Sequence, residues 1–178
     1  CCGTRRPGSR LSIKSRPIKP RQAALMDSLL PGLRVPQQPF DPRALMPAAA
    51  ETWLEIGFGG GEHLIEQARR HPDVGFIGCE PFNEGVAKAL VGIEENNLPN
   101  IRLHMGDARE VTMRLKDGSV DRCFILFADP WPKARHHKRR LIQEDFVAEL
   151  ARLIRPGGAL RLATDWADYA EWMLERLL

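Results

Sequence analysis

The feature that most constrains the fold is an alternation of apolar with amphipathic segments, which begins near residue 51 and continues to the end of the chain. Strands that alternate with helices form a parallel sheet covered on both faces, because each return crossover carries a helix. The sequence therefore predicts an α/β domain with a doubly wound, mostly parallel sheet. The predicted strands are 52–58, 75–81, 100–108, 120–129 and 159–165, and the predicted helices are 62–70, 83–97, 109–116, 140–155 and 168–178.

The first fifty residues have a different character. Residues 1–20 are basic, contain three prolines and show no hydrophobic periodicity, so we expect an extended or disordered arm. A short amphipathic helix is predicted at 21–30, followed by a connector at 31–49 that holds five prolines. We therefore divide the chain into residues 1–50, a basic N-terminal arm with a short helix and a Pro-rich connector, and residues 51–178, the α/β domain.

The sequence argues against several protein classes. No apolar run approaches the roughly 18 residues that span a membrane, and the N-terminal residues lack the apolar core of a signal peptide. Cys1 and Cys2 lie in the arm, whereas Cys79 and Cys123 fall within predicted strands, where buried thiols are expected rather than disulfides. No cysteine or histidine pair has metal-ligand spacing. We therefore expect a cytoplasmic protein without a membrane segment or a metal ion.

Positive charge is concentrated in two segments, although the formal net charge is only +3. Residues 1–22 carry seven Lys/Arg and residues 133–140 carry five, and neither segment contains an acid. The remaining residues have 14 basic and 23 acidic side chains, a net charge of −9. Concentrated positive charge attracts a polyanion such as nucleic acid. The alternative for either segment alone is a solubilising tail or a solvated loop.

Every predicted strand delivers an acidic residue to its carboxyl end: Glu55, Glu80, Asp107, Asp129 and Asp165. In an open α/β sheet these ends form one edge, and ligands bind beyond it. A single acid at such a position often caps the following helix. Five like charges at one edge would repel one another, which capping alone does not explain. We therefore interpret this edge as a ligand-binding site.

A glycine-rich turn with the sequence GFGGGE, residues 57–62, follows the first strand. Glycines here let the backbone turn tightly and approach a ligand. Glu62 stands where a dinucleotide fingerprint has its third glycine, and a carboxylate there is a poor neighbour for a pyrophosphate. No G-K-[ST] sequence follows, which argues against a P-loop. The turn therefore indicates a nucleoside ligand without phosphates.

The strand-end carboxylates match the parts of one such ligand, S-adenosylmethionine. Glu80 is placed to accept hydrogen bonds from both ribose hydroxyls, and Asp107 is suited to accept a hydrogen bond from an adenine amine. Glu55 and Asp129 are suited to hold an ammonium or sulfonium group, because carboxylates favour cations. S-adenosylmethionine combines adenine, ribose, sulfonium and amino-acid groups and has no phosphate.

A basic loop with the sequence DPWPKARHHKRRL, residues 129–141, follows the fourth strand. Its prolines stiffen it, Trp131 offers a flat surface for stacking a base, and its cations can bind phosphates. Cations at the start of the helix predicted at 140–155 oppose the helix dipole, which favours an anion there. The alternatives are that Trp131 only anchors the loop, and that His136 and His137 are neutral side chains that are solvated or contact phosphate.

Five segments, in this order and spacing, closely resemble the bacterial tRNA (guanine-N7-)-methyltransferases: EIGFGGGEHL, CEP, GDA, DPWPKARHHKRRL and ATD-xxx-YA. The resemblance runs from about residue 3 to the end of the chain. The glycine-rich turn is shared with most class I methyltransferases, whereas DPWPK-x-RH-x-KRRL is specific to this family. The resemblance implies a Rossmann-like class I methyltransferase domain at 51–178, S-adenosylmethionine as methyl donor, and methylation at N7 of a guanine in the variable loop of tRNA.

The resemblance also implies roles for individual residues. Asp129 matches the family's proposed catalytic residue, no metal is implied, and we expect a monomer. The residues matched to donor binding are Glu55, Gly57, Gly59, Glu80, Asp107 and Asp129, those matched to substrate binding are Lys133 and Asp165, and those matched to RNA contact are Arg135, His136, His137, Lys138, Arg139 and Arg140.

The sequence departs from the family at its C-terminus. The family continues into two further strands with a Thr-x-x-Glu motif that closes the site, whereas this chain ends at Leu178. We therefore expect a sheet truncated at its C-terminal end. Two other functions stay open: a class I methyltransferase acting on another RNA position or on protein, and a non-catalytic RNA-binding module. The strand-end acids argue against the binding module, which has no use for acids beside phosphates.

Overall fold

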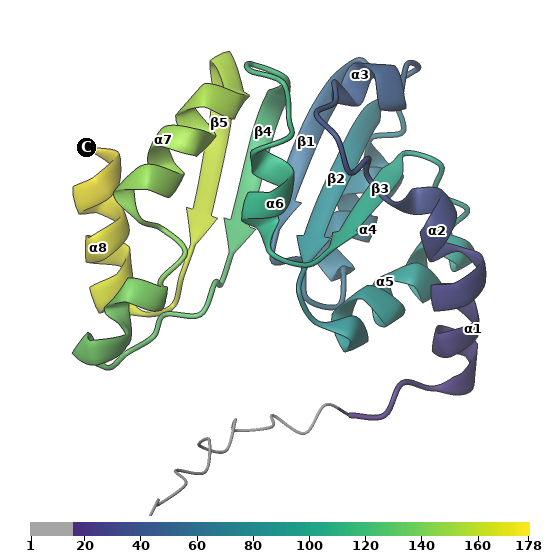
Figure 1. Ribbon diagram of the computed structural model, residues 1–178, viewed down its shortest axis with the longest axis horizontal. Helices are drawn as coiled ribbons and strands as arrows, with labels where there is room; N and C mark the ends of the chain where they lie inside the picture. The colour runs from purple at the N-terminus through teal and green to yellow at the C-terminus, as the bar shows by residue number, and fades with distance from the viewer. Residues whose placement is uncertain (1–15) are drawn as a thin grey trace, which may run out of the picture.

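The computed structural model describes residues 16–178 and contains one sheet of five strands. These are β1 (Glu51–Ile56), β2 (Val74–Glu80), β3 (Ile101–Met105), β4 (Val120–Leu126) and β5 (Ile154–Ala163). Their order is β3-β2-β1-β4-β5, and every neighbouring pair is parallel, as the strand arrows in Figure 1 show. The predicted α/β class with a doubly wound parallel sheet is therefore confirmed.

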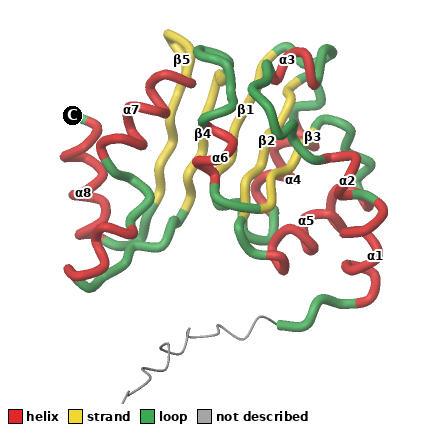
Figure 2. The backbone as a smooth tube through the Cα atoms, in the orientation of Figure 1, coloured by secondary structure: helices red, strands yellow, loops and turns green. Residues whose placement is uncertain are grey.

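Helices cover both faces of the sheet (Figures 1 and 2). They are α1 (Pro20–Ser28), α2 (Leu30–Leu33), α3 (Pro42–Leu45), α4 (Glu62–Arg70), α5 (Asn83–Glu95), α6 (Ala108–Thr112), α7 (Glu144–Leu153) and α8 (Ala167–Leu177), together with a 3₁₀ helix η1 (Ala134–Arg139). On one face, α4 and α5 form a buried cluster with the sheet, and α1 and α2 lie beside them. On the other face, α6, α7 and α8 form a second cluster.

The alternation of side chains along β1 explains this two-sided core. Trp53 belongs to the cluster with α4 and α5, whereas its neighbours Leu54 and Ile56 belong to the cluster with α6, α7 and α8. Every residue of β2 is buried, which is typical of a central parallel strand covered by helices on both faces. The two apolar clusters therefore fix the helices against the sheet and hold its carboxyl edge in place.

The chain reverses its direction across the sheet after β3. Strand β2 lies beside β1, and β3 lies beside β2 at one edge of the sheet. The chain then returns to the centre and places β4 on the other side of β1. The loops that follow β1 and β4 diverge from this point toward opposite faces, which leaves a crevice at the carboxyl edge. The residues directly after these two strands are therefore the ones expected to contact a ligand.

All five strands end earlier than the sequence predicts. Strand β2 stops one residue before its predicted end, and β1, β3, β4 and β5 each stop two to three residues before theirs. Consequently Asp107, Asp129 and Asp165 lie in the loops rather than in the strands. At β4 the cause is Phe127, whose φ of 57° lies in the left-handed region that a strand cannot accommodate.

The predicted start of the last strand is wrong. The sequence suggested that Pro156-Gly157-Gly158 separates a helix from a strand at 159, but β5 already begins at Ile154. Pro156 is tolerated because β5 lies at an edge of the described sheet. A Cβ at Gly158 would lie 2.8 Å from the carbonyl oxygen of Asp121, so glycine permits a close approach of the two strands here.

The helix predicted at 140–155 is also shorter, because α7 begins at Glu144. The side-chain amide of Gln143 donates to the carbonyl oxygens of His137 and Arg140, both at 3.0 Å, and so ends the preceding turn. The first turn of α7 contains Glu144 and Asp145, whose charges suit the helix dipole. The prediction that cations open this helix and favour a bound anion is therefore wrong.

The segment before the sheet packs on the helices of one face. The helix predicted at 21–30 is present as α1 and α2, and α1 lies against α5. Arg21 forms ion pairs of 2.9 Å with Glu94 and Glu95 of α5. Of the arm predicted at 1–20, residues 1–15 lie outside the described residues, as do Cys1 and Cys2.

The two described cysteines are buried and unpaired, which confirms their prediction as buried thiols. Burial raises the pKa of Cys79 to about 12. Within residues 16–178, no group of three or more His, Cys, Asp or Glu side chains is arranged to hold a metal ion. The helices described for these residues are all too short or too polar to cross a bilayer.

The contact between α5 and the glycine-rich turn yields a stability prediction. Helix propensity alone favours Ala over Gly by about 1 kcal/mol. A Cβ at Gly85, however, would collide with the carbonyl oxygen of Gly59 and lie 3.0 Å from Cγ of Glu80. We expect Gly85→Ala to lower the free energy of unfolding by about 1–3 kcal/mol, measured by urea denaturation.

Gly32→Ala is the matched control, since an added Cβ there meets nothing within 4 Å. It should be neutral or slightly stabilising. A Gly85→Ala variant as stable as this control would contradict the close packing of α5 on the turn.

Candidate functional site

The glycine-rich turn between β1 and α4 adopts the conformation that its sequence predicts. Gly57, Gly59 and Gly61 have φ values of 72°, 58° and 84°, which residues with a Cβ rarely adopt. The N–H of Gly57 donates to the carbonyl oxygen of Cys79 at 2.8 Å. This bond holds the turn against the end of β2, at the carboxyl edge of the sheet.

Glu80 joins the turn to the end of β2. Its carboxylate accepts hydrogen bonds from the N–H groups of Gly59, at 2.8 Å, and Phe82, at 3.3 Å. Burial raises the pKa of Glu80, although these two bonds act in the opposite direction. Glu80 therefore lies beside the glycine-rich turn, where the predicted ribose contact would be made.

Glu55 is buried and paired within the protein. Oε2 of Glu55 lies 2.8 Å from Nδ1 of His63, which belongs to the first turn of α4. Burial raises the pKa of Glu55, and the contact with His63 partly offsets this effect. Sequence reasoning missed His63. The signal was present, since a histidine at the start of the helix that follows the turn is well placed to reach back to the end of β1.

A cleft of about 210 Å³ opens beside the turn. Its lining is mostly apolar and includes neither Lys nor Arg, which suits a flat ring without a phosphate group. Asp107 lies at this cleft and accepts a hydrogen bond of 2.9 Å from the N–H of Arg109, so it also caps α6. The lining residues are Ile56, Gly57, Cys79, Pro81, Gly106, Asp107, Ala108 and Leu141.

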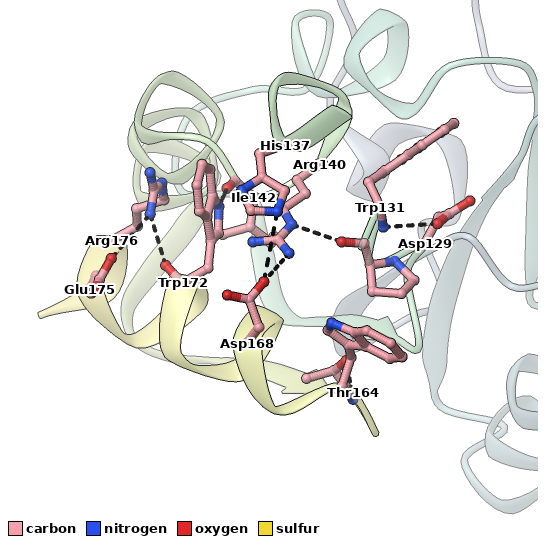
Figure 3. A network of polar contacts seen from close by, with 12 residues as sticks. Asp129, Trp131, His137, Arg140, Ile142, Thr164, Asp168, Trp172, Glu175 and Arg176 are labelled. Atoms are coloured by element: carbon pink, nitrogen blue, oxygen red, sulfur yellow. Dashed lines mark hydrogen bonds and ion pairs between the residues drawn. The ribbon is translucent and has the colours of Figure 1, made fainter. Parts of the chain in front are cut away.

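The loop after β4 is strained around Asp129. Phe127 and Trp131 have φ values of 57° and 43°, which are outliers for bulky side chains. Such residues cost of order 1–3 kcal/mol each and cluster at functional sites. The exposed carboxylate of Asp129 accepts a hydrogen bond of 3.0 Å from the N–H of Trp131, which closes a tight turn around Pro130 (Figure 3).

Asp165 lies near Asp129 in the topology, because each follows one of two paired strands. Leu126 of β4 pairs with Ala163 of β5, and the N–H of Phe127 donates to the carbonyl oxygen of Ala163 at 2.8 Å. The carboxylates of Asp129 and Asp165 are both exposed. The structure therefore brings the predicted catalytic and substrate-binding acids to the same part of the edge.

Part of the basic loop forms η1 and faces solvent. Arg135, Lys138 and Arg139 are exposed, as is Lys133 directly before η1. The guanidinium of Arg139 lies 5.0 Å from the centre of the Trp131 ring, a cation–π distance. Partial burial and the surrounding cations lower the pKa of His136. This agrees with a neutral histidine, and His136 also packs edge-on against Trp131 at 5.8 Å.

The buried position of Arg140 disagrees with its prediction as an RNA contact. Its side chain has 0% exposed surface, and it forms an ion pair with Asp168 and a hydrogen bond with the carbonyl oxygen of Pro130. His137 also turns inward and packs edge-on against Trp172 with ring centres 5.4 Å apart (Figure 3). Both side chains therefore face α8 rather than solvent, because the 3₁₀ helix divides the basic residues between two sides.

Four of the five strand-end acids have local partners: Glu55 contacts His63, Asp107 contacts Arg109, and Glu80 and Asp129 accept from backbone N–H groups. Mutual repulsion among the acids is therefore weaker than the sequence suggests. Glu62, whose charge counted against a pyrophosphate, is paired with Lys88 of α5. Its charge is therefore partly offset.

Comparisons with known proteins agree with this geometry. A family described as "Putative methyltransferase" matches residues 49–178. A tRNA (guanine-N(7)-)-methyltransferase of Caulobacter sp. strain K31 is 62% identical over 166 residues, which cover 93% of this chain and 74% of the relative. A protein of the same name from Hyphomonas neptunium is 52% identical, over 88% of this chain and 72% of the relative.

Solved structures support the fold alone. An antibiotic-related methyltransferase superposes with a TM-score of 0.60 at 18% identity, covering 84% of this chain and 77% of that structure. The relatives of high identity, which match over most of both lengths, show the family. The chain belongs to the family of bacterial tRNA (guanine-N(7)-)-methyltransferases.

Proposed function

We propose that this enzyme transfers the methyl group of S-adenosylmethionine to N7 of a guanine in the variable loop of tRNA, in the cytoplasm and as a monomer. The main observation behind this proposal is that two suitable features lie together at the carboxyl edge of the sheet. An apolar cleft beside the glycine-rich turn lies on one side, and a loop with an exposed acid, a tryptophan and exposed cations lies on the other. Relatives named for this reaction support it.

The residues around the cleft fit S-adenosylmethionine. The apolar lining suits adenine, and Asp107 is suited to accept from its amine. Glu80 is suited to bind the ribose hydroxyls, and its backbone partners hold the carboxylate in place for that contact. The absence of Lys and Arg from the lining suits a ligand that carries positive charge and lacks phosphates. Glu55 and Asp129 supply negative charge for its ammonium and sulfonium groups.

The chemistry needs positioning more than proton transfer. S-adenosylmethionine supplies an electrophilic methyl group, and guanine N7 has a free lone pair and no proton to lose. Asp129 and Asp165 therefore act by orienting the base, as acceptors for its N1–H and exocyclic amine, rather than as general bases. Methylation at N7 leaves the base positively charged, so these two carboxylates also stabilise charge that develops on the guanine.

The exposed cations of the basic loop complete the site. Arg135, Lys138 and Arg139 lie on the solvent side of η1, where they are suited to bind tRNA phosphates. Lys133 stands between Asp129 and η1 and is suited to meet the phosphate nearest the target base. The guanidinium of Arg139 already lies over the ring of Trp131, so Trp131 also has a packing role within the loop. An incoming base would displace Arg139 or stack on the other face of the ring.

A methyl-transfer assay tests the function directly. Labelled S-adenosylmethionine and an unmodified tRNA transcript should give label at one variable-loop guanine, mapped by strand scission specific for N7-methylguanine. A transcript with adenine at that position should take up no label, because the reacting nitrogen then lies in a different base. Label at another position would favour a different RNA methyltransferase, and failure to bind S-adenosylmethionine would favour the non-catalytic module.

Asp129→Asn is the companion variant in that assay. It should lose most of the transfer while it keeps measurable affinity for S-adenosylmethionine in calorimetry, since Glu80 and the cleft remain. Full turnover by this variant would remove Asp129 from the mechanism.

The raised pKa of Glu55 predicts a gain in stability when its charge is removed. Below its ordinary pKa of 4.5, the carboxyl group is protonated in both folded and unfolded chains. As the pH rises above 4.5 through the raised folded pKa, the unfolded chain ionises first, so the folded state loses relative stability. Glu55→Gln should therefore have a higher Tm than the wild type at pH 7, and this difference should shrink as the pH falls toward 4.5.

Glu66→Gln is the control for this pH series. Hydrogen bonds from Arg69 and Arg70 lower the pKa of Glu66, so its ionised form is favoured in the folded protein. This variant should show no stability gain at pH 7. A Glu55→Gln variant that is less stable than the wild type at neutral pH would show that the His63 contact outweighs the cost of burial.

Charge reversal tests the RNA contacts. Arg139→Glu should weaken tRNA binding and reduce the slope of log K against log salt by about one for each phosphate that the arginine binds. Lys116→Glu is the control, because Lys116 is also exposed but precedes β4, at the opposite edge of the sheet. Equal salt slopes for Arg139→Glu and the wild type would reject this RNA contact.

A further inference from the structure

Arg140 has an environment unlike that of the other arginines in the basic loop. Its side chain has 0% exposed surface, and it is among the largest fully buried side chains of the described chain. A buried cation is unfavourable unless it is paired and hydrogen-bonded. The contacts that compensate this charge therefore indicate what the residue does.

The guanidinium of Arg140 links two segments (Figure 3). Its Nε donates to the carbonyl oxygen of Pro130 at 2.7 Å, and one terminal nitrogen pairs with the carboxylate of Asp168. The group also lies 4.9 Å from the ring centres of both Tyr169 and Trp172. Asp168, Tyr169 and Trp172 all belong to α8. One guanidinium thus ties the loop after β4 to the helix after β5.

We propose that Arg140 is a positioning residue for the two substrate-facing carboxylates: through the Pro130 carbonyl and Asp168 it fixes the loop of Asp129 relative to the segment of Asp165. This inference rests on the proposed function and assigns Arg140 a role other than RNA contact. Asp165 lies three residues before Asp168 and just outside the N-terminus of α8. Asp129 is therefore one residue, and Asp165 three residues, from the group that Arg140 holds.

Because of the turn at Asp129, a bond to the Pro130 carbonyl also restrains the position of the Asp129 carboxylate. The Asp129 carboxylate accepts from the N–H of Trp131, so residues 129–131 form one closed unit with the Pro130 carbonyl as its outward acceptor. Phe127 and Trp131 hold left-handed φ values that bulky residues avoid. A loop in this conformation needs contacts from outside to keep its shape, and among the described residues the bond from Arg140 is the side-chain contact made to Pro130.

Packing alone does not require a cation at this position. One terminal nitrogen of Arg140 is buried without a hydrogen-bond partner in the described structure. An apolar side chain of similar volume would avoid that cost, and such replacements are often neutral or stabilising. The guanidinium supplies what an apolar residue cannot, namely directional bonds to both the loop after β4 and helix α8.

Arg140→Lys tests the proposal, because lysine keeps the charge but cannot hold both partners in the fork geometry of arginine. We expect the single-turnover rate of methyl transfer at saturating tRNA and donor to fall about 10-fold or more, as misplacement of reacting groups predicts. The Kd values for donor and tRNA, and the salt slope of tRNA binding, should stay close to those of the wild type. Asp168→Asn should reproduce this split, and the double variant should be less than additive.

Arg152→Lys is the matched control. Arg152 pairs with Asp117 and Glu149 and donates to the carbonyl oxygens of Leu115 and Thr112, so its replacement removes similar bonds at the opposite edge of the sheet. It should lower Tm while the saturated rate per folded molecule is kept. If Arg140 had a purely structural role, Arg140→Lys would likewise lower Tm and keep the saturated rate. A smaller salt slope of tRNA binding for Arg140→Lys would instead show that Arg140 contacts RNA.

A second readout does not depend on the reaction. Amide hydrogen exchange at Trp131 reports the hydrogen bond to Asp129, and it should accelerate in Arg140→Lys but not in Arg152→Lys. Unchanged exchange at Trp131 would overturn the positioning role whether or not the wild type methylates tRNA. An inactive wild type with accelerated exchange in the variant would instead overturn the proposed function and leave the link between Arg140 and the loop supported.

Discussion

The parallel pairing of all five strands is the constraint on which the rest of this structure depends. Because every strand runs the same way, every carboxyl end meets at one edge, and five loops reach that edge from different parts of the sequence. The reversal of strand order after β3 then separates the loops after β1 and β4. Acids that are up to 110 residues apart in sequence thereby share one edge. The two apolar clusters hold the helices on the faces and leave this edge open to ligands.

The edge divides into two chemically different halves. Around β1, β2 and β3 the carboxylates have local partners, and Asp107 borders an apolar cleft, an arrangement that suits a small cationic nucleoside. After β4 and β5 the carboxylates are exposed and lie beside a strained, cation-rich loop, an arrangement that suits a nucleic-acid base and its phosphates. The two halves meet where the methyl group would pass between them. The family reaction thus agrees with one edge whose two parts suit the donor and the base respectively.

The sequence predicted the parallel sheet, the helix at 62–70 and the burial of Cys79, since these follow from local patterns of apolar residues and glycines. It failed where contacts of individual side chains, some of them distant in sequence, decide the outcome. The helix predicted at 140–155 starts later, because Gln143 ends the turn before it and Arg140 is drawn inward by Asp168. The early start of β5 depends on edge position and on the close approach of Gly158 to the neighbouring strand. A run of five cations gave no indication that one of them would be buried under α8.

The buried carboxylates of Glu55 and Glu80 link the concentration of ligand to the stability of the folded protein. Each has a raised pKa, so its charge is less favourable in the folded chain than in water. If the donor binds beside them as proposed, its positive charge would offset this cost, and a ligand present at 100 times its Kd adds about 2.7 kcal/mol of stability. Folded protein in a cell would then increase with the level of methyl donor. When the donor is scarce, proteases would remove more of the enzyme, which would match the capacity for tRNA modification to the methyl groups available.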